Sequence, residues 1–492
     1  MNNTSTLEID ARPFTSGDAA RPSKKHQPLR LLVVMASYGD KNLHLLRRQI
    51  ACYQQMSFDV DIVVVSNNEK DLGPGVETKV GLPSRNPWSL PFAHKQIFLE
   101  RADRYDVFAY SEDDIGVTEF NILAFLEVNA HLHADEVAGF IRYEVDSNGE
   151  RSFPDVFGQF HWESTSAQQR GPHTIAQFTN EHAAFYLLTQ QQLRTAIASG
   201  GFLKAPYEGE YDMLCTAATD PYTSCGLRKV VCISSLDDFS VHHLSNKYVG
   251  VMGAGHAVVQ QQIDALLQIG RRAKDGSNLF KLLPRLRLAD WGKSYYEPVN
   301  THVLEVVKSN KASVLSIGSG WGATERALAD RGVAVTALPL DPVIGSLMSD
   351  SGVEIIEGSM EHCFEVLANR SFDYVIIGNL LHLIPDPKTT LQRAAHLLRK
   401  GGTVVIYGPN FDSVRIKLKQ ALGRLGHQRF SHLARLGLFE VSPFFVKRAL
   451  RSSGLSRFLV HWVAESSRSA WASRMGVLGA DGWYMEAVQE AG

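Results

Sequence analysis

Residues 314–322 decide the fold of this chain, and they read Val314-Leu315-Ser316-Ile317-Gly318-Ser319-Gly320-Trp321-Gly322. An apolar run ends there in glycines at every second position, and a helical pattern follows from Thr324. Glycine permits a tight turn from strand to helix and a close approach of the backbone to a ligand, and the helix N-terminus offers free N–H groups. Many α/β proteins have such a turn without a ligand, so the segments that follow it must show whether this turn belongs to a binding site.

The rest of a nucleotide-binding unit follows this turn in order. The patterns predict strands at 333–340, 372–377 and 403–407, and a helix at 389–399. The stretches VLSIGSGWG, FDYVIIGNLLHLIPDP and LLRKGGTVVIYGPN resemble the class I S-adenosylmethionine-dependent methyltransferases. The resemblance implies a Rossmann-like domain with S-adenosylmethionine as its cofactor.

Length and composition indicate a multidomain globular protein. The chain has 492 residues, with 44% hydrophobic and 21% charged residues, which predicts two to three domains. Its net charge of −2 argues against a nucleic-acid partner. The five cysteines show no metal-ligand spacing, and no apolar run approaches the ~20 residues of a membrane span. We expect a cytoplasmic enzyme. Peripheral attachment to the inner face of the membrane and homo-oligomerisation are both compatible with these features.

The first half of the chain predicts a second parallel α/β unit. Apolar strands at 29–35 and 60–65 flank a helical pattern at 43–54, and another strand at 105–110 follows. The fold class is therefore α/β with two Rossmann-like domains. The predicted boundaries are 1–28 for a flexible tail, 29–250 for the first domain, 251–292 for a helical linker and 293–492 for the second domain.

Three adjacent carboxylates follow the strand at 105–110. Glu112, Asp113 and Asp114 stand where this strand leaves the sheet, and ligands gather at the carboxyl ends of strands in open α/β sheets. Adjacent carboxylates repel one another unless a cation compensates them, and Mg²⁺ or Mn²⁺ prefers such oxygen ligands. The alternative interpretation is a solvated acidic turn.

This arrangement over residues 29–250 resembles the GT-A glycosyltransferases, whose short acidic motif follows the corresponding strand. The resemblance implies a nucleotide-sugar donor (UDP or GDP), a bound Mn²⁺ or Mg²⁺, and a glycan or lipid-linked glycan acceptor. It also implies Asp114 and Glu112 as metal ligands, with Glu112 and Asp113 near the donor, and a late histidine, His242 or His243, as a further ligand.

Other polar residues complete the predicted first site. Ser37, Tyr38 and Asp40 follow the first strand and Asn67 follows the second, so these four residues are candidates for contact with the base and ribose. Turn formation explains them equally well. An inverting enzyme needs a carboxylate to deprotonate the acceptor, and Glu210 or Asp212 is the candidate base. Asp212 fits a helix N-cap equally well.

The methyltransferase resemblance assigns the second site. Gly318, Gly320 and Gly322 would approach the donor, and Tyr295 and Tyr296 would cover its methionine end. His382, after the fourth strand, is a candidate base for methylating a hydroxyl, with a structural histidine as the alternative.

Two departures from the family pattern weaken this site. Pro339 stands where the family places an acid that binds the ribose, and Asp341 is the expected substitute, two residues on. Ser359 stands where an acid commonly faces the adenine. The leading hypothesis is a bifunctional glycosyltransferase and O-methyltransferase of cell-surface polysaccharide synthesis. The alternatives are a glycosyltransferase with a degenerate methyltransferase domain as scaffold, and a non-catalytic glycan-binding assembly protein.

Overall fold

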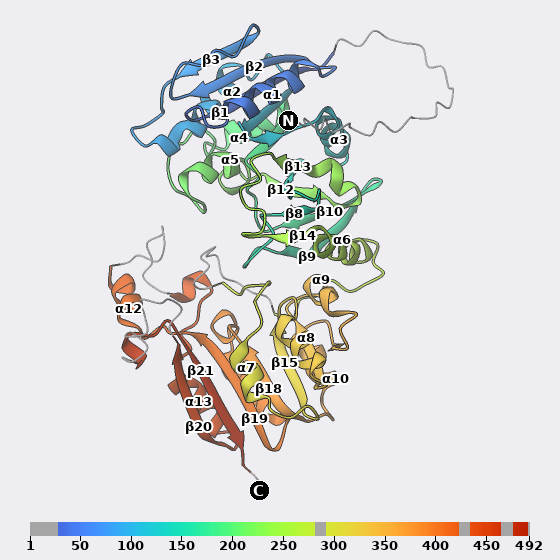
Figure 1. Ribbon diagram of the computed structural model, residues 1–492, viewed down its shortest axis with the longest axis vertical. Coiled ribbons are helices and arrows are strands. Elements are labelled where there is room, and N and C mark those ends of the chain that lie inside the picture. Colours follow the sequence, from blue (N-terminus) through green and yellow to red (C-terminus); the bar gives the residue numbers. More distant parts are fainter. Residues whose placement is uncertain (1–27, 281–291, 423–432, 464–475, 491–492) are drawn as a thin grey trace, which may run out of the picture.

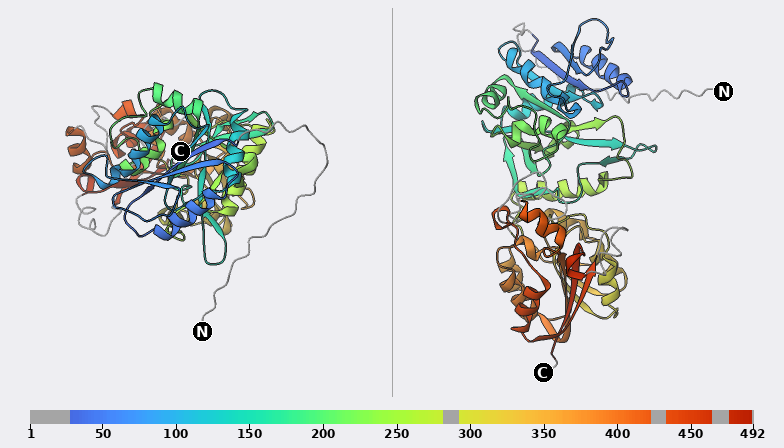
Figure 2. Two further views of the ribbon diagram at one scale, coloured as in Figure 1. Left: turned by 90° about the horizontal axis from the view of Figure 1, so that it is seen from above. Right: turned by 90° about the vertical axis from the view of Figure 1, so that its left-hand side faces the viewer.

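The computed structural model describes residues 28–280, 292–422, 433–463 and 476–490. Its two halves lie one above the other along the long axis, with the C-terminal half lowest in Figure 1 and in the right-hand view of Figure 2. The predicted tail lies, apart from Pro28, outside the described residues, as does the 281–291 part of the predicted linker.

A five-stranded sheet forms the upper end of the first half, with the order β11-β4-β1-β2-β3. Its strands are β1 (Arg30–Ser37), β2 (Asp59–Ser66), β3 (Val76–Val80), β4 (Val107–Glu112) and β11 (Phe185–Thr189). β1 pairs in parallel with both β2 and β4, and β11 is antiparallel to β4. The predicted parallel βαβ unit, with α1 at Leu43–Gln54, is confirmed. Because the chain leaves β1 toward β2 on one side and β4 lies on the other, the ends of β1 and β4 flank a topological switch point.

Two smaller sheets complete the first half. One has the order β6-β12-β10-β9 and the other β14-β8-β7-β13-β5. Their strands are β5 (Ile115–Gly116), β6 (Glu136–Ala138), β7 (Ile141–Val145), β8 (Arg151–Phe153), β9 (Trp162–Arg170), β10 (His173–Phe178), β12 (Arg228–Cys232), β13 (Ser240–His243) and β14 (Ala254–Gly255). The helices are α2 (Ala93–Glu100), α3 (Glu119–Asn129), α4 (Gln190–Ala198), α5 (Met213–Thr223) and α6 (His256–Gly270).

Helix α6, predicted as part of the linker, packs into the core of the first half. Val259, Ile263 and Leu266 are buried in that core. On another side of α6, the Gln261 side chain donates to the carbonyl of Ser346 in the second half, at 2.6 Å. The helix therefore contacts both halves, and the domain boundaries stay a prediction.

The second half is built on a seven-stranded sheet with the order β17-β16-β15-β18-β19-β21-β20. Its strands are β15 (Ser313–Ser319), β16 (Ala334–Pro339), β17 (Glu354–Ile355), β18 (Phe372–Gly378), β19 (Leu398–Pro409), β20 (Leu455–Val463) and β21 (Gly482–Gln489). The helices are α7 (Thr301–Val306), α8 (Ala323–Asp330), α9 (Pro342–Gly345), α10 (Met360–Val366), α11 (Pro387–His396), α12 (Val414–Ala421) and α13 (Pro443–Arg451). The predicted strands are present, and the helix predicted at 389–399 is α11, although residues 398–399 belong to β19. β21 runs antiparallel between β19 and β20.

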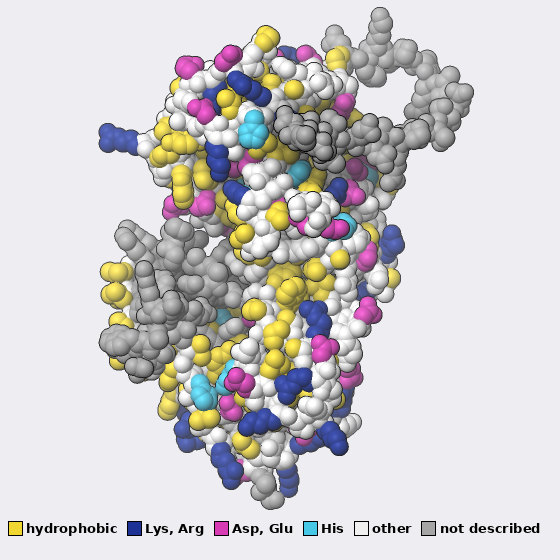
Figure 3. Space-filling view, viewed as in Figure 1, with side chains coloured by type: hydrophobic (Ala, Val, Ile, Leu, Met, Phe, Trp, Pro, Cys, Tyr) yellow, Lys and Arg dark blue, Asp and Glu magenta, His cyan; other side chains and the backbone are white. Residues whose placement is uncertain are grey.

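Basic and acidic side chains are interspersed on the surface shown in Figure 3, as expected from the small net charge. Within the described residues, none of the helices combines the length and the apolar character that a membrane crossing requires.

Candidate functional site

The predicted acidic cluster lies at the switch point and is largely buried. Asp113 and Asp114 are 7% and 6% exposed. The Ser37 hydroxyl, at the end of β1, donates to Asp113 at 2.7 Å, and the Asn42 amide donates to the same carboxylate at 2.8 Å. Burial excludes the simple solvated turn, because a buried carboxylate needs partners or a cation. The structure thus brings the predicted Ser37 and Asp113 together.

His243 connects Asp114 to a second buried carboxylate. Its Nε2 lies 3.2 Å from Asp114 Oδ2, and its Nδ1 lies 2.6 Å from Glu144 Oε1. Glu144 also accepts from the backbone N–H of Tyr248 at 2.9 Å, which fixes its position. Although burial opposes ionisation, the contact with His243 holds the pKa of Asp114 below its usual range. A carboxylate on the far nitrogen is the usual way in which a metal-binding histidine is oriented.

The two other predicted ligands are placed differently. His242 stacks on Tyr143 with ring centroids 4.9 Å apart, and its Nε2 lies 3.1 Å from Asn246. Neighbouring residues of β13 point to opposite faces, so His242 and His243 are not brought together. Burial, and then the neighbouring Asp114, raise the pKa of Glu112 to about 8. Asp114 and His243 therefore fit a divalent cation, whereas the roles of Glu112 and His242 stay predictions.

The raised pKa of Glu112 predicts a pH-dependent stability. Its folded pKa of about 8 exceeds the ordinary value of 4.5, so the folded state holds this proton more tightly. Stability from this group is complete below about pH 4.5 and is lost as the pH rises through about 8. In chelator-treated protein, the unfolding free energy of Glu112→Gln should therefore fall less than that of wild type over this range. If the unfolding free energies of both proteins, measured by denaturant unfolding at each pH, fell by the same amount, the raised pKa of Glu112 would be contradicted.

The remaining predicted donor-binding residues surround the end of β1. Asp40 pairs with Lys70 at 3.0 Å, and hydrogen bonds from Lys70 and Asn68 lower its pKa. Asn67 accepts from the backbone N–H of Gly39 at 2.7 Å, and Tyr38 is 55% exposed. These contacts are those of a stabilised turn, and they leave the ring of Tyr38 on the surface near the cluster.

The two candidate bases lie at the start of α5. Asp212 caps this helix by accepting from the backbone N–H of Cys215 at 2.8 Å, as one of the two sequence interpretations predicted. Asp212 and Glu210 are both exposed. A nearby cavity of ≈390 Å³ lies between the end of β3, helix α2 and residues 203–206. Its described lining includes Lys79, Lys95 and Lys204 rather than the residues predicted to bind the donor.

In the second half, the glycine turn has the predicted form. Gly318 and Gly322 have φ values of +76° and +80°, which favour glycine, and Gly322 precedes the first turn of α8. Gly320 lies against protein backbone: a Cβ at this position would stand 2.3 Å from the carbonyl oxygen of Tyr295. That carbonyl accepts from the backbone N–H of Trp321 at 2.8 Å. Tyr295 thus lies against the turn, whereas the predicted contact of Tyr295 and Tyr296 with the methionine end of the donor stays a prediction.

A second segment spans the groove in which the family holds the donor nucleoside. The backbone N–H of Leu279 donates to Leu340 at 2.9 Å, and its carbonyl accepts from Met360 at 3.1 Å. Leu279 is 3% exposed, and it bridges Leu340, after β16, and Met360, at the start of α10, which adjoin the positions to which the resemblance assigns the ribose and adenine contacts. The cavity left at the glycine turn measures only ≈20 Å³. Ligand pockets measure about 300–1,000 Å³, so this cavity by itself is too small to hold the donor.

Both covering segments are attached to the first half. His161 stacks on Tyr295 with ring centroids 4.0 Å apart and an angle of 5°, and Tyr295 donates its backbone N–H to Gly158 at 2.7 Å. The Ser164 hydroxyl lies 2.7 Å from the carbonyl of Gly276 and 2.5 Å from Asn278 Oδ1. The two halves therefore meet directly over the glycine turn and the adjoining groove.

The other predicted residues of the second site have structural contacts. Tyr296 bonds to Gln262 at 3.0 Å, and Ser359 caps α10 through the backbone N–H of His362. His382 is buried in a 3₁₀ turn at Leu381–Leu383, with its ring 5.8 Å from that of Phe411. Lys293, which the sequence analysis did not select, is buried and bonds to Glu297 and to the carbonyl of Gly378.

Asp341 serves as the N-cap of α9. Its Oδ1 accepts from the backbone N–H groups of Val343 and Ile344 at 2.8 and 2.9 Å. Burial raises its pKa to about 6. We expect Asp341→Ala to lower the unfolding free energy by about 0.5–2 kcal/mol, the usual cost of a lost cap. Asp341→Asn keeps an N-cap acceptor and should unfold near the wild-type denaturant midpoint; equal midpoints for Asp341→Ala and wild type would refute the capping role.

Comparison with known proteins supports the assignment of the second half. Residues 315–406 match the family described as "Methyltransferase domain". Ubiquinone biosynthesis O-methyltransferases of Xylella fastidiosa (strain M23) and Xanthomonas campestris pv. campestris (strain B100) are 29% and 31% identical over 110 and 103 residues, which cover 21% and 19% of this chain. The chain spans about half the length of these curated relatives, namely 45% and 42%. A SAM-dependent methyltransferase from Archaeoglobus fulgidus gives a TM-score of 0.30 at 15% identity, over 38% of this chain and 92% of that one.

The family match and the strand order agree on one class of domain. Residues 315–406 match a methyltransferase domain, and the strand order of the surrounding sheet agrees with the Rossmann-like domain that the sequence resemblance predicts. Its glycine turn holds two glycines at positive φ; the backbone of Tyr295 bonds to Trp321 in this turn, and the backbone of Leu279 bonds to Leu340 and Met360.

Proposed function

We propose that the chain is a two-domain transferase. Its first half transfers a sugar from a nucleotide-sugar to a glycan acceptor with the help of a divalent cation, and its second half methylates a hydroxyl of a sugar. Placing both steps in one chain raises the effective concentration of the intermediate at the second site. Synthesis of a cell-surface polysaccharide suits this pair of reactions.

The observation that carries the first activity is the buried series Asp114–His243–Glu144 at the switch point. Asp114 and His243 would hold the cation, which would offset the charge that develops on the departing diphosphate. Glu144 positions His243 through its Nδ1. Asp212 and Glu210 stay candidates for the base that accepts the acceptor's proton, because both lie exposed at the start of α5.

The second activity is supported by the family match over residues 315–406 and by the O-methyltransferase relatives. The filled donor groove favours a second candidate, in which only the first half is catalytic and the methyltransferase domain is a scaffold. Under the two-activity proposal, donor binding displaces Leu279 and Tyr295 from the groove.

Two product assays separate these candidates. The first follows release of nucleoside diphosphate from UDP- and GDP-sugars with Mn²⁺, and the second follows transfer of labelled methyl groups from S-adenosylmethionine to glycan acceptors. Activity in both assays supports the two-activity proposal, and activity in the first alone supports the scaffold candidate. Inactivity in both, over a panel of sugars and acceptors, would leave the glycan-binding alternative.

A further inference from the structure

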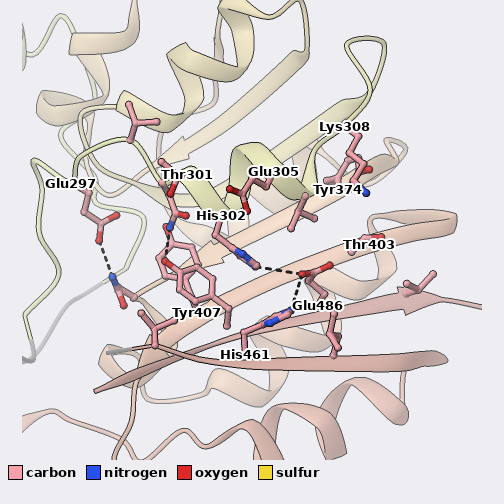
Figure 4. Close-up of a pocket in the computed structure, with 18 of the residues that line it drawn as sticks. Glu297, Thr301, His302, Glu305, Lys308, Tyr374, Thr403, Tyr407, His461 and Glu486 are labelled. Carbon is pink, nitrogen blue, oxygen red and sulfur yellow. Dashed lines mark hydrogen bonds and ion pairs between the residues drawn. The ribbon is translucent and has the colours of Figure 1, made fainter. Parts of the chain in front are cut away.

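A large cavity of the second half adjoins the cavity at the glycine turn and shares Glu297 and Tyr407 with it. It measures ≈1160 Å³ and is bounded by α7 and by the open face of β18, β19, β21 and β20 (Figure 4). His302, His461 and Glu486 lie together in its wall. Among the described residues, these are the three histidine, cysteine or acidic side chains whose ligand atoms all lie within 4.8 Å of one another.

The strand register explains why these side chains meet. His461 lies opposite Tyr484 and Leu459 lies opposite Glu486 in the antiparallel pair of β20 and β21. Alternate residues share a face, so His461 and Glu486 project from the same side of the sheet. The intervening residues of β21, Trp483, Met485 and Ala487, are buried on the opposite face. His302 reaches the pair from α7, which crosses above this side of the sheet (Figure 4).

The distances suit a bound metal. Nε2 of His302 lies 3.4 Å and Nε2 of His461 lies 3.6 Å from Glu486 Oε1. Bond lengths of about 2.0–2.2 Å place two ligands of a tetrahedral zinc about 3.3–3.5 Å apart. His302 Nε2 is buried, and within the described part of the chain it has no hydrogen-bond partner, although it lies near the carboxylate. This nitrogen is therefore free to act as a ligand.

We propose that His302, His461 and Glu486 bind a divalent transition metal of the zinc class. Two imidazoles and one carboxylate are ligands that this class of ion accepts, and three protein ligands leave a fourth position open. All three side chains line the cavity, whose wall also holds Tyr374 and Tyr407. The ion would join α7 to the C-terminal strands, and its open position would take water or an oxygen ligand. This site is distinct from Asp114 and His243 in the first half.

Zinc titration of the full-length, chelator-stripped protein in competition with a chromophoric chelator tests the proposal. The test variant is His461→Ala, because this side chain is 45% exposed on the edge strand β20 and its removal spares the core. The matched control is His396→Ala, an exposed histidine at the end of α11. A second comparison is His243→Ala, which removes the candidate ligand of the first half.

We expect wild type, His396→Ala and His243→Ala to share a zinc equivalent of equal affinity. His461→Ala should lower the zinc affinity of this site by at least about 100-fold. Loss of a residue that only hydrogen-bonds to a metal ligand already costs about 10–100-fold in affinity. Cobalt substitution gives a second readout, in which the spectrum of a four-coordinate ion should disappear in His461→Ala alone. The proposal would be overturned if His461→Ala kept every zinc equivalent of wild type at unchanged affinity, if zinc binding were lost only in His243→Ala, or if wild type bound no zinc.

Discussion

Replacing Asp114 by alanine is expected to abolish both sugar transfer and metal-dependent nucleotide binding. Asp114 is 6% exposed and lies 3.2 Å from His243, so its loss removes one of the two side chains that fit the cation. His243 would then keep its contacts with Glu144 and with the Ser245 hydroxyl but lose its carboxylate on Nε2. Without the cation, the departing diphosphate loses its main charge stabilisation. Sugar transfer should therefore fall by at least about 100-fold, which is the usual cost of removing one stabilising donor.

The matched control for this variant is Asp103→Ala. Asp103 is an acidic residue of the same half, 84% exposed in its ion pair with Arg194 and remote from the cluster in its contacts. It should keep wild-type turnover of the nucleotide-sugar. Isothermal titration with Mn²⁺ and nucleotide, alongside the transfer assay, measures both effects. If Asp114→Ala, or wild type treated with a chelator, transferred sugar at the untreated wild-type rate, the first half would not be a metal-dependent glycosyltransferase.

Replacing Leu279 by aspartate is expected to raise the affinity for S-adenosylmethionine by at least about tenfold. Leu279 is 3% exposed, and an unpaired carboxylate costs several kcal/mol in such a position. The segment should therefore leave the groove in a larger fraction of molecules. Apparent affinity scales with the fraction that can bind, and each tenfold gain corresponds to about 1.4 kcal/mol. Equilibrium binding of labelled S-adenosylmethionine measures the change.

Two further variants show whether this gain comes from opening the groove. Ser164→Ala removes the contacts with Gly276 and Asn278 from the side of the first half, and it should raise affinity in the same direction by a smaller factor. Val251→Asp introduces the same charge at a position that is 75% exposed, and it should change nothing. Unchanged affinity in Leu279→Asp would show that this segment does not compete with the donor. Undetectable binding in every variant would favour the scaffold candidate.

The sequence predicted the parallel strands of the two large sheets because these strands are continuous apolar runs. The segments 31–35, 62–65 and 314–317 are buried on both faces, so their composition alone identifies them. The glycines at 318 and 322 were likewise recognisable, since their positive φ excludes most other residues. Strands β20 and β21 were missed, because one face of each lines an open cavity and their apolar residues only alternate.

The candidate sites were less predictable than the sheets that carry them. Asn42 precedes α1 like an ordinary cap, yet its side chain bonds to Asp113 instead of the helix. Glu144 reaches His243 across 99 residues of sequence, and no local pattern encodes that contact. Leu279 belongs to a segment with a polar, hinge-like composition, and its place in the donor groove follows only from tertiary packing. These are long-range contacts, and a single sequence gives no signal for them.

Calorimetric titration of the wild-type chain with UDP- and GDP-sugars, with and without Mn²⁺, tests the central claim most directly. The buried carboxylates at the end of β4 and the oriented His243 predict that one of these donors binds, and that its binding requires the cation. Failure of both donors to bind at millimolar concentration, or equal binding in the presence of a strong chelator, would contradict a metal-dependent nucleotide-sugar site in the first half.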